Sequence, residues 1–328
     1  MVISLNRLGD TIFTIPAIKE IQKKFGNKAT IICFPEATPI YKFILDEIQL
    51  IEINHDDFYF GNRIAKLHAK RKLKKINPSL IFDFTASMVS ASLIFNIRAK
   101  KIIGTNGNQF RKIYDEFVEF RKTPQLKDIY LDVISSMVQV SKKNKLLEIY
   151  QSLNPYGKIL IHPFGGWKEK EWNLKKYIAL AEILNQKFNT SLIVQKGQIS
   201  KDILDEIDYL NLEVIQTKSV TELIESVKNS SIFIGNDSGP VNIANFLGKP
   251  TFTIFGATNP DYTKTNVNFQ LYLYKSLKCS AKQDEKFCTI GGMVHCCSGI
   301  QCMNLINVAE VYDNLIPLLT KYCKEKQI

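Results

Sequence analysis

The sequence predicts an α/β protein made of two Rossmann-like domains with an interdomain cleft. Short β-rich segments alternate with helical patterns, which is the sequence form of parallel βαβ units. A linker-like composition interrupts this alternation at residues 141–157, after which it starts again. The 328 residues correspond to about two domains. We therefore expect an N-terminal domain over residues 1–150 and a C-terminal domain over residues 151–328, and whether the last helix packs back on the first domain stays open.

The first half begins as a strand, a loop and a helix. Residues 1–5 are a brief apolar run, residues 6–10 read as a loop, and apolar side chains then recur at helical spacing. A helix tolerates proline best in its first turn, so we expect the regular helix to start near Pro16 and to end before Gly26. Further strands are expected at residues 29–34, 49–53, 80–84 and 101–103, with a basic amphipathic helix at 63–77.

The second half repeats the pattern with stronger strands. Runs of Ile, Leu, Val and Phe bounded by turn residues predict the strands, and apolar positions at helical spacing predict the helices between them. The expected strands are residues 158–162, 191–195, 213–215, 231–234 and 251–255, and the expected helices are 174–188, 204–210, 220–226 and 241–246. In such sheets a ligand binds beyond the carboxyl ends of the strands, so we expect it in the cleft between the domains.

Composition excludes several protein classes. Hydrophobic residues make up 45% and charged residues 23%, which fits neither a mainly disordered nor a mainly membrane-embedded chain. Without a long apolar run or the features of a signal peptide, the sequence predicts a cytoplasmic protein. The seven cysteines are an odd number, which argues against an obligatory disulfide framework. The first strand is short, which leaves open a start upstream of Met1.

The charge is strongly basic and unevenly distributed. The net charge is +11, and residues 1–150 carry 24 Lys and Arg against 15 Asp and Glu, a net +9. Such an excess indicates an anionic partner: nucleic acid, a phosphorylated small molecule or a membrane surface. The basic helix expected at residues 63–77 can equally be a solvated face. A pure nucleic-acid binder is disfavoured, because no recognition motif accompanies the charge.

Three loops that follow predicted strands carry candidate functional residues. Asn236-Asp237-Ser238-Gly239-Pro240 precedes a helix, whose free backbone N–H groups can seat a phosphate or a sugar hydroxyl. The loop at residues 163–172 contains Gly165, Gly166, Lys168 and Lys170, and either lysine can supply a point charge to a diphosphate. Asp10, in the loop after the first strand, can act as a general base. Each loop alone could also be an ordinary turn with a helix cap.

Taken together and in order, these motifs look like glycosyltransferase family 9, which contains the lipopolysaccharide heptosyltransferases. The resemblance covers nearly the whole chain. It rests on Arg7-Leu8-Gly9-Asp10 with Thr14-Ile15-Pro16-Ala17, His162-Pro163 with Lys170-Glu171-Trp172, Asn236-Asp237-Ser238-Gly239-Pro240, Phe255-Gly256-Ala257-Thr258-Asn259-Pro260, and Cys302-Met303 with Ile306 and Val311.

The resemblance implies a GT-B fold and a reaction. Family members transfer a sugar with inversion, without a metal or another cofactor, from a nucleotide sugar that is usually ADP-heptose. The acceptor is the inner core of lipopolysaccharide or lipooligosaccharide. By the same resemblance, we expect a monomer in the cytoplasm that contacts the cytoplasmic face of the inner membrane peripherally and binds no nucleic acid.

The resemblance also implies roles for individual residues. Asp10 resembles the general base that takes the proton of the acceptor hydroxyl. Lys170 resembles the lysine that offsets the charge growing on the leaving diphosphate. Glu222 resembles the acidic residue that binds the donor ribose, and Asp237 the carboxylate that holds sugar hydroxyls. The other expected donor contacts are Gly165, Gly166, Ser238, Gly239 and Asn242, of which Ser238 and Gly239 lie near the phosphates through their backbone.

The chain departs from the family pattern at two places. Asn242 stands where the family usually has a histidine, and it can hydrogen-bond but cannot carry charge. Residues 164–167 lack the hydroxyl side chains often seen there, which leaves more of the phosphate binding to backbone amides. On the acceptor side, we expect Arg63, Lys66 and Arg111 to steer the anionic acceptor.

Five cysteines, Cys279 to Cys302, fall within 24 residues without a C-x-x-C pair and a spaced partner pair, so no metal site is expected among them.

Other functions of the whole chain stay open. These are a family 9 transferase that uses a hexose or N-acetylhexosamine donor and a nucleotide-sugar epimerase of GT-B-like architecture. An oxidoreductase is disfavoured, because no G-x-G-x-x-G opens either half.

Overall fold

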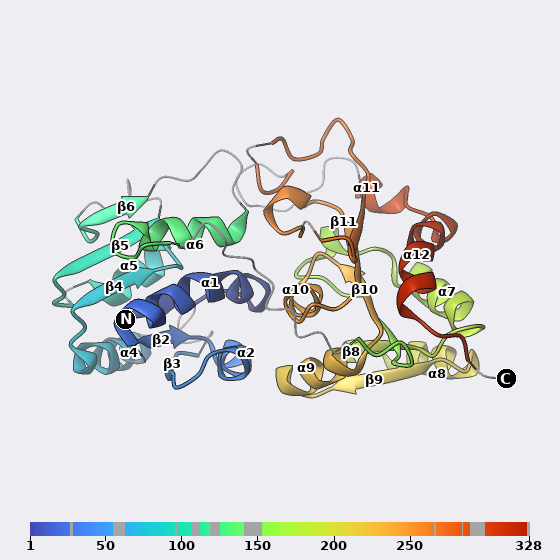
Figure 1. Ribbon diagram of the computed structural model, residues 1–328, viewed down its shortest axis with the longest axis horizontal. Coiled ribbons are helices and arrows are strands. Elements are labelled where there is room, and N and C mark those ends of the chain that lie inside the picture. The colour runs from blue at the N-terminus through green and yellow to red at the C-terminus, as the bar shows by residue number, and fades with distance from the viewer. Residues whose placement is uncertain are drawn as a thin grey trace. The chain divides into compact units, whose positions relative to one another are not determined.

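A computed structural model describes residues 1–26, 29–54, 63–95, 97–105, 112–118, 125–140, 153–265, 267–283, 285–288 and 299–326 (Figure 1). The chain divides into two compact units, Met1–Leu146 and Leu147–Ile328. Each unit contains one six-stranded sheet, and every strand pair in both sheets is parallel. The α/β class predicted from the alternation of strands and helices is therefore confirmed.

The N-terminal sheet has the order β3-β2-β1-β4-β5-β6. Its central strand β1 is completely buried, since strands on both sides cover it, and each residue of its Val-Ile-Ser segment has less than 1% exposure. In Figure 1, α1 and α6 lie side by side along this sheet, and they contact each other. The strands are β1 (Val2–Ser4), β2 (Thr30–Cys33), β3 (Gln49–Glu52), β4 (Leu80–Asp83), β5 (Lys101–Thr105) and β6 (Glu116–Val118), and the helices are α1 (Leu8–Phe25), α2 (Thr38–Ile44), α4 (Arg63–Ile76), α5 (Met88–Ile94) and α6 (Leu126–Ser135).

The C-terminal sheet has the order β12-β11-β10-β7-β8-β9. Its strands are β7 (Ile159–His162), β8 (Thr190–Gln195), β9 (Glu213–Thr217), β10 (Ile232–Asn236), β11 (Thr251–Phe255) and β12 (Gln270–Tyr274). Its helices are α7 (Leu174–Asn185), α8 (Lys201–Tyr209), α9 (Val220–Asn229), α10 (Gly239–Phe246), α11 (Gln301–Asn304) and α12 (Val308–Tyr322). The last helix, α12, packs against α7 and buries Val311, Leu315, Leu318 and Leu319 in the core of this unit.

The first helix was predicted wrongly at its start. It begins at Leu8 rather than near Pro16, which lies inside it. The loop after β1 is therefore shorter than expected, and Asp10 is already the third helical residue. Pro16 is buried in the middle of α1, where tertiary burial outweighs the hydrogen bond that proline cannot donate. Helix propensity alone could not show this.

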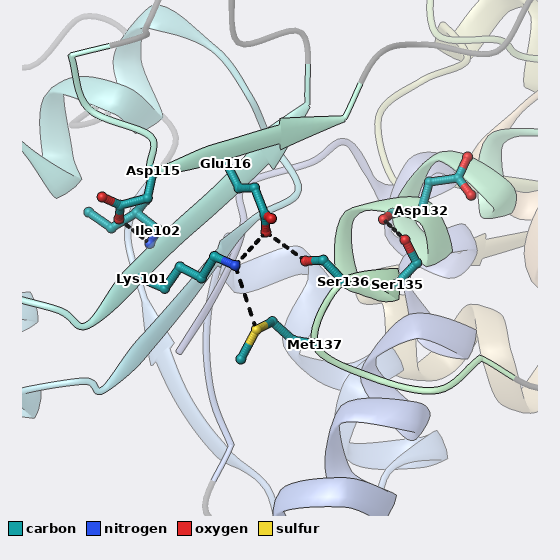
Figure 2. A network of polar contacts seen from close by, with 8 residues as sticks. All are labelled: Lys101, Ile102, Asp115, Glu116, Asp132, Ser135, Ser136 and Met137. Atoms are coloured by element: carbon teal, nitrogen blue, oxygen red, sulfur yellow. Dashed lines mark hydrogen bonds and ion pairs between the residues drawn. The ribbon is translucent and has the colours of Figure 1, made fainter.

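Two edge strands were absent from the prediction: β6 has only three residues, and β12 reads as an ambiguous Gln-Leu-Tyr-Leu-Tyr segment. A polar network holds β6 in place (Figure 2). Lys101 pairs with Glu116 at 2.8 Å, and Ser136 donates a hydrogen bond of 2.7 Å to the same carboxylate. Asp115 accepts from the backbone N–H of Ile102 at 2.8 Å. These contacts tie β6 to β5 and to the end of α6.

In the part of the chain that the structure describes, no helix is long and apolar enough to cross a membrane.

Candidate functional site

A buried ion pair lies at the carboxyl edge of the C-terminal sheet. Lys170 belongs to the short helix η4 (Lys168–Lys170) in the loop after β7, and Asp237 directly follows β10. The Lys170 Nζ atom lies 2.6 Å from Asp237 Oδ2, with side-chain exposures of 12% and 3%. Burial raises the pKa of the Asp237 carboxyl, but the Lys170 charge and several hydrogen bonds outweigh burial, so the pKa lies below its usual value. Asp237 is thus a buried, ionised carboxylate that is paired with the Lys170 ammonium group.

The second oxygen of Asp237 is also held. Thr263, which follows the short helix η5 (Pro260–Tyr262), donates a hydrogen bond of 3.1 Å from Oγ1 to Asp237 Oδ1. The Thr258 hydroxyl lies near this carboxylate and contributes to lowering its pKa, but it makes no hydrogen bond within the described part of the chain. The two oxygens of Asp237 therefore have different partners, a cation on one side and the Thr263 hydroxyl on the other.

Asn236 joins the two loops that carry the ion pair. Its Nδ2 atom donates to the carbonyl of Pro163 at 2.7 Å, and its Oδ1 atom accepts from the Trp172 backbone N–H and the Tyr177 hydroxyl, both at 2.9 Å. Trp172 is 1% exposed and donates its ring N–H to the carbonyl of Ile306 at 3.0 Å. This fully buried amide therefore fixes both ends of loop 163–172, and the start of α7 that follows it, against β10.

The glycine pair predicted in this loop is closely packed on one side. The Gly165 backbone N–H donates to Glu171 Oε1 at 2.9 Å, and a Cβ atom at Gly165 would lie 3.2 Å from the Cβ of Lys170. Gly165 therefore allows the loop to fold back on Lys170. Gly166 is exposed.

Ser238, Gly239 and Asn242 lie at the start of α10. Ser238 is the N-cap residue, and its side chain makes no capping hydrogen bond. Its Oγ atom is buried and has no hydrogen-bond partner among the described residues. Asn242 is 6% exposed, and its backbone N–H donates to the Ser238 carbonyl at 3.0 Å. The first N–H groups of a helix have no partner within it, so this end of α10 can bind an anion beside the ion pair.

Glu222 lies elsewhere on the same sheet edge. It is an exposed residue of α9, which follows the edge strand β9, and β7 and β8 stand between β9 and β10. Its carboxylate accepts from the Lys218 backbone N–H at 2.8 Å, while its own N–H donates to Ser219 Oγ at 3.2 Å. Glu222 thus helps to cap the start of α9, and no contact joins it to Lys170 or Asp237 within the described ranges.

Asp10 lies in the first turn of α1, in the N-terminal unit, and is partly buried. Burial raises the pKa of the neighbouring Tyr130, and the negative charge of Asp10 raises it further. Close by, the Tyr41 hydroxyl contacts Ser4 Oγ at 2.7 Å and Thr14 Oγ1 at 2.9 Å. Asp10 therefore stands next to buried hydroxyl groups after the carboxyl end of β1.

The expected acceptor residues are described only in part. Arg63 and Lys66 lie on α4, but their side chains fall outside the described part of the structure, as does all of Arg111. The basic side chains of the second half of α4 are described and mostly exposed: Lys70, Arg71, Lys72, Lys74 and Lys75.

Among the described residues, no three His, Cys, Asp or Glu side chains are arranged to hold a metal ion. Cys279 and Cys288 are partly buried and Cys302 is buried, whereas Cys296 and Cys297 fall outside the described residues. Thr263 and Phe287, which both lie at the ion pair, were not predicted from the sequence. No local pattern marks either residue, because each reaches the site from a distant loop.

Comparisons with known proteins agree on one family. The model of glycosyltransferase family 9 (heptosyltransferase) matches residues 67–290. Lipopolysaccharide heptosyltransferase 1 of Campylobacter coli is 24% identical over 309 residues, which cover 81% of this chain and 87% of that protein.

The similar solved structures show the GT-B fold. A family 9 glycosyl transferase from Veillonella parvula has a TM-score of 0.73 at 16% identity, covering 98% of this chain and 96% of its own. The ADP-heptose lipopolysaccharide heptosyltransferase II of E. coli has a TM-score of 0.70 at 15% identity, covering 98% of both chains. The iron-containing dodecameric glycosyltransferase TibC of E. coli has a TM-score of 0.56 at 14% identity, covering 97% and 74%.

Proposed function

This chain belongs to glycosyltransferase family 9, and on that premise we propose that it transfers heptose from ADP-heptose to the inner core of lipopolysaccharide or lipooligosaccharide. The observation that carries the proposal is the Lys170–Asp237 pair, a cation and a carboxylate 2.6 Å apart and largely buried beside the start of α10. A site for a nucleotide sugar uses both groups. The cation pairs with the anionic diphosphate, and the carboxylate accepts hydrogen bonds from the sugar hydroxyls.

In the proposed reaction, Asp10 takes the proton of the acceptor hydroxyl as its oxygen attacks the anomeric carbon. The bond from that carbon to the phosphate oxygen breaks, and the nucleoside diphosphate leaves with the bonding electrons. Lys170 stabilises the charge that grows on the diphosphate. Gly166, Ser238 and Gly239 supply N–H groups to the phosphates. Gly165, whose N–H is bonded to Glu171, lets the loop backbone approach the phosphates closely. Asp237 and Asn242 bind sugar hydroxyls, and Glu222 binds the ribose.

The identity of the sugar depends most on Asn242. This residue is neutral and nearly buried, at 6% exposure, at a position where the family usually has histidine. An amide can donate to and accept from the hydroxyls of several sugars. A family 9 enzyme that transfers a hexose or an N-acetylhexosamine is therefore the second candidate, and an epimerase that acts on the nucleotide sugar alone is the third.

A screen of nucleotide sugars by mass spectrometry tests the proposal. The protein is incubated with each donor, with and without lipopolysaccharide acceptors of increasing truncation. We expect the acceptor mass to increase by one heptose with ADP-heptose only. A hexose or N-acetylhexosamine adduct replaces the first candidate by the second. Conversion of a donor without any acceptor assigns the protein as an epimerase.

Metal independence, the monomeric state and the peripheral contact with the cytoplasmic face of the inner membrane belong to the same proposal. TibC is an iron-containing dodecamer, so metal content and mass are worth measuring directly. We expect full transfer activity after treatment with a chelator, with less than stoichiometric metal by elemental analysis. Light scattering is expected to give the mass of one chain, and vesicles of anionic lipid are expected to bind the protein.

A further inference from the structure

Two aromatic rings lie close to the Lys170 ammonium group in addition to its carboxylate partner. The Lys170 Nζ atom lies 4.4 Å from the centroid of the Trp167 ring and 5.7 Å from that of Phe287. The two rings contact each other edge to face, with centroids 5.2 Å apart and an angle of 77°. Trp167 belongs to the same loop as Lys170, but Phe287 comes from the cysteine-rich stretch much later in the chain.

The segment that carries Phe287 is anchored to the site. Phe287 forms an isolated antiparallel bridge with Thr258, in the loop after β11. On either side of the bridge, the Asn259 N–H donates to the Lys286 carbonyl at 3.0 Å and the Cys288 N–H donates to the Ala257 carbonyl at 3.1 Å. Since Thr263, a few residues further along the same stretch, donates to Asp237 Oδ1, the stretch after β11 contacts both the carboxylate and the segment that carries the aromatic ring.

Aromatic faces hold an ammonium group in a particular way. The ring quadrupole attracts the cation, and the attraction increases where water is excluded. An oxygen acceptor takes up one of the ammonium's N–H donors, whereas the attraction to a ring does not. An ammonium has three donors, and the closest acceptor of Lys170 is Asp237 Oδ2 at 2.6 Å, with the Asp237 carbonyl at 3.4 Å. The rings thus fix the long, flexible side chain while leaving donor capacity for phosphate oxygens.

We propose that Phe287 and Trp167 are positioning residues that hold Lys170 in place for the diphosphate of the donor. This inference rests on the proposed function, because it names how the same site recognises its nucleotide. It gives the segment 285–288 of the cysteine-rich stretch a role: the segment delivers Phe287 to the donor site. A positioned lysine binds a diphosphate more tightly than a mobile one, since less side-chain entropy is lost on binding.

Paired substitutions separate the π face from simple packing. Phe287→Leu and Trp167→Leu keep an apolar side chain but remove the ring, whereas Phe287→Tyr and Trp167→Phe keep a ring. Binding of ADP is measured by calorimetry and binding of adenosine by ligand-observed NMR. We expect the leucine variants to bind ADP about three- to tenfold more weakly and the aromatic variants to stay within about twofold. Adenosine, which has no phosphate, should bind equally to all of them.

A double-mutant cycle provides an independent measurement. If the rings act through Lys170, Phe287→Tyr and Phe287→Met should differ in ADP affinity in the parent protein but not in the Lys170→Met background. Equal ADP binding by the leucine variants and the parent overturns the inference, and so does an equal loss of ADP and adenosine binding. If the parent protein binds no ADP at all, the proposed function itself is wrong, and the inference that rests on it is wrong as well.

Discussion

Lys170 contacts one carboxylate and two aromatic rings, and these partners come from three separate stretches of the chain. Such a residue combines two roles. It neutralises a buried carboxylate, and it is the cation that the proposed reaction needs for its leaving group. A substitution at Lys170 therefore affects both stability and catalysis, and the two effects can be separated by a second substitution.

We predict that Lys170→Met lowers kcat/KM for the donor. The decrease should correspond to a loss of about 2–4 kcal/mol of transition-state stabilisation, the usual loss when a charge-stabilising donor is removed. It should also lower the Tm, because Asp237 is left buried without its cation. The double variant Lys170→Met/Asp237→Asn should regain much of the Tm but not the activity. An unchanged rate in Lys170→Met would remove this lysine from the site.

For Asp10, we predict that Asp10→Asn lowers kcat by about a hundredfold or more while the affinity for ADP stays nearly the same. The proposed base acts on the acceptor and not on the donor. Because Asp10 lies in the first turn of α1, a small loss of stability, about 0.5 kcal/mol, is also expected from the helix dipole. Calorimetry with ADP and single-turnover kinetics check this. An equal loss of ADP binding would assign Asp10 a purely structural role.

At the scale of elements, the loops after β7, β10 and β11 form the proposed donor site in the C-terminal unit. His162, Asn236 and Phe255 are the last residues of these strands, and the loops that follow them supply Lys170, Asp237 and the segment contacting Phe287. Parallel strands end at one edge of the sheet, so three loops separated in sequence converge there. The same geometry buries His162 in the central strand.

Burial lowers the pKa of His162 from 6.5 to about 4. Between these values the unfolded chain binds a proton at this residue and the folded protein does not, so stability is complete above pH 6.5 and falls as the pH decreases towards 4. The expected loss is about 3 kcal/mol. Other buried groups also titrate, among them Asp83, whose pKa burial raises. The difference in unfolding free energy between the parent protein and His162→Gln isolates the histidine; parallel curves from pH 7 to 4 would contradict the prediction.

Helix α9 offers a test of the ribose contact, because Glu222 already has a structural role there as a capping residue. Glu222→Gln keeps an oxygen that can accept from the Lys218 N–H, so the helix cap should remain. If the carboxylate binds the ribose, loss of its charge should weaken ADP binding about tenfold. The control is 2′,3′-dideoxy-ADP, for which the variant and the parent should have the same affinity. Should the two nucleotides lose affinity equally, Glu222 serves only as a cap.

At the scale of the whole molecule, the basic charge of the N-terminal unit divides between the two edges of its sheet. Helix α4 joins β3 to β4, which run parallel, so it begins near the carboxyl edge and ends near the amino edge. Arg63 is the first residue of the helix, whereas Lys74 and Lys75 lie in its last turn, where Lys74 and Arg98 line one hollow. Asp10 follows the carboxyl end of β1. If Asp10 is the proposed base, positions at the start of α4 are therefore nearer to the acceptor's edge of the sheet than positions at its end.

We predict that Arg63→Glu/Lys66→Glu raises the KM for the acceptor and weakens its dependence on salt, because steering by charge is screened at high ionic strength. The matched variant Lys74→Glu/Arg98→Glu changes the net charge equally at the other edge and should leave this KM unchanged. Acceptor KM measured at low and high salt checks both. If the two pairs act alike, the charge has only a general effect.

Much of the architecture could be predicted from local patterns. The alternation of strands and helices led to two Rossmann-like units. The loops that contain Asp10, Lys170 and Asp237 became candidates because each follows a strand at the edge where ligands bind, and the family resemblance then selected these residues within them. The errors were local as well. Pro16 suggested a late start for α1, and the short strands β6 and β12 have too few residues for a clear period.

The partnerships within the site could not be predicted in this way. Lys170 and Asp237 are 67 positions apart, and Phe287 meets Trp167 only because the loop after β11 pairs with a distant segment. Glu222 turned out to occupy its carboxylate in a helix cap. Hydrophobic period and turn residues are properties of neighbouring positions, so they are readable along the chain. A buried charge, by contrast, obtains its partner from whatever the packing of the sheet brings near, and that packing exists only in three dimensions.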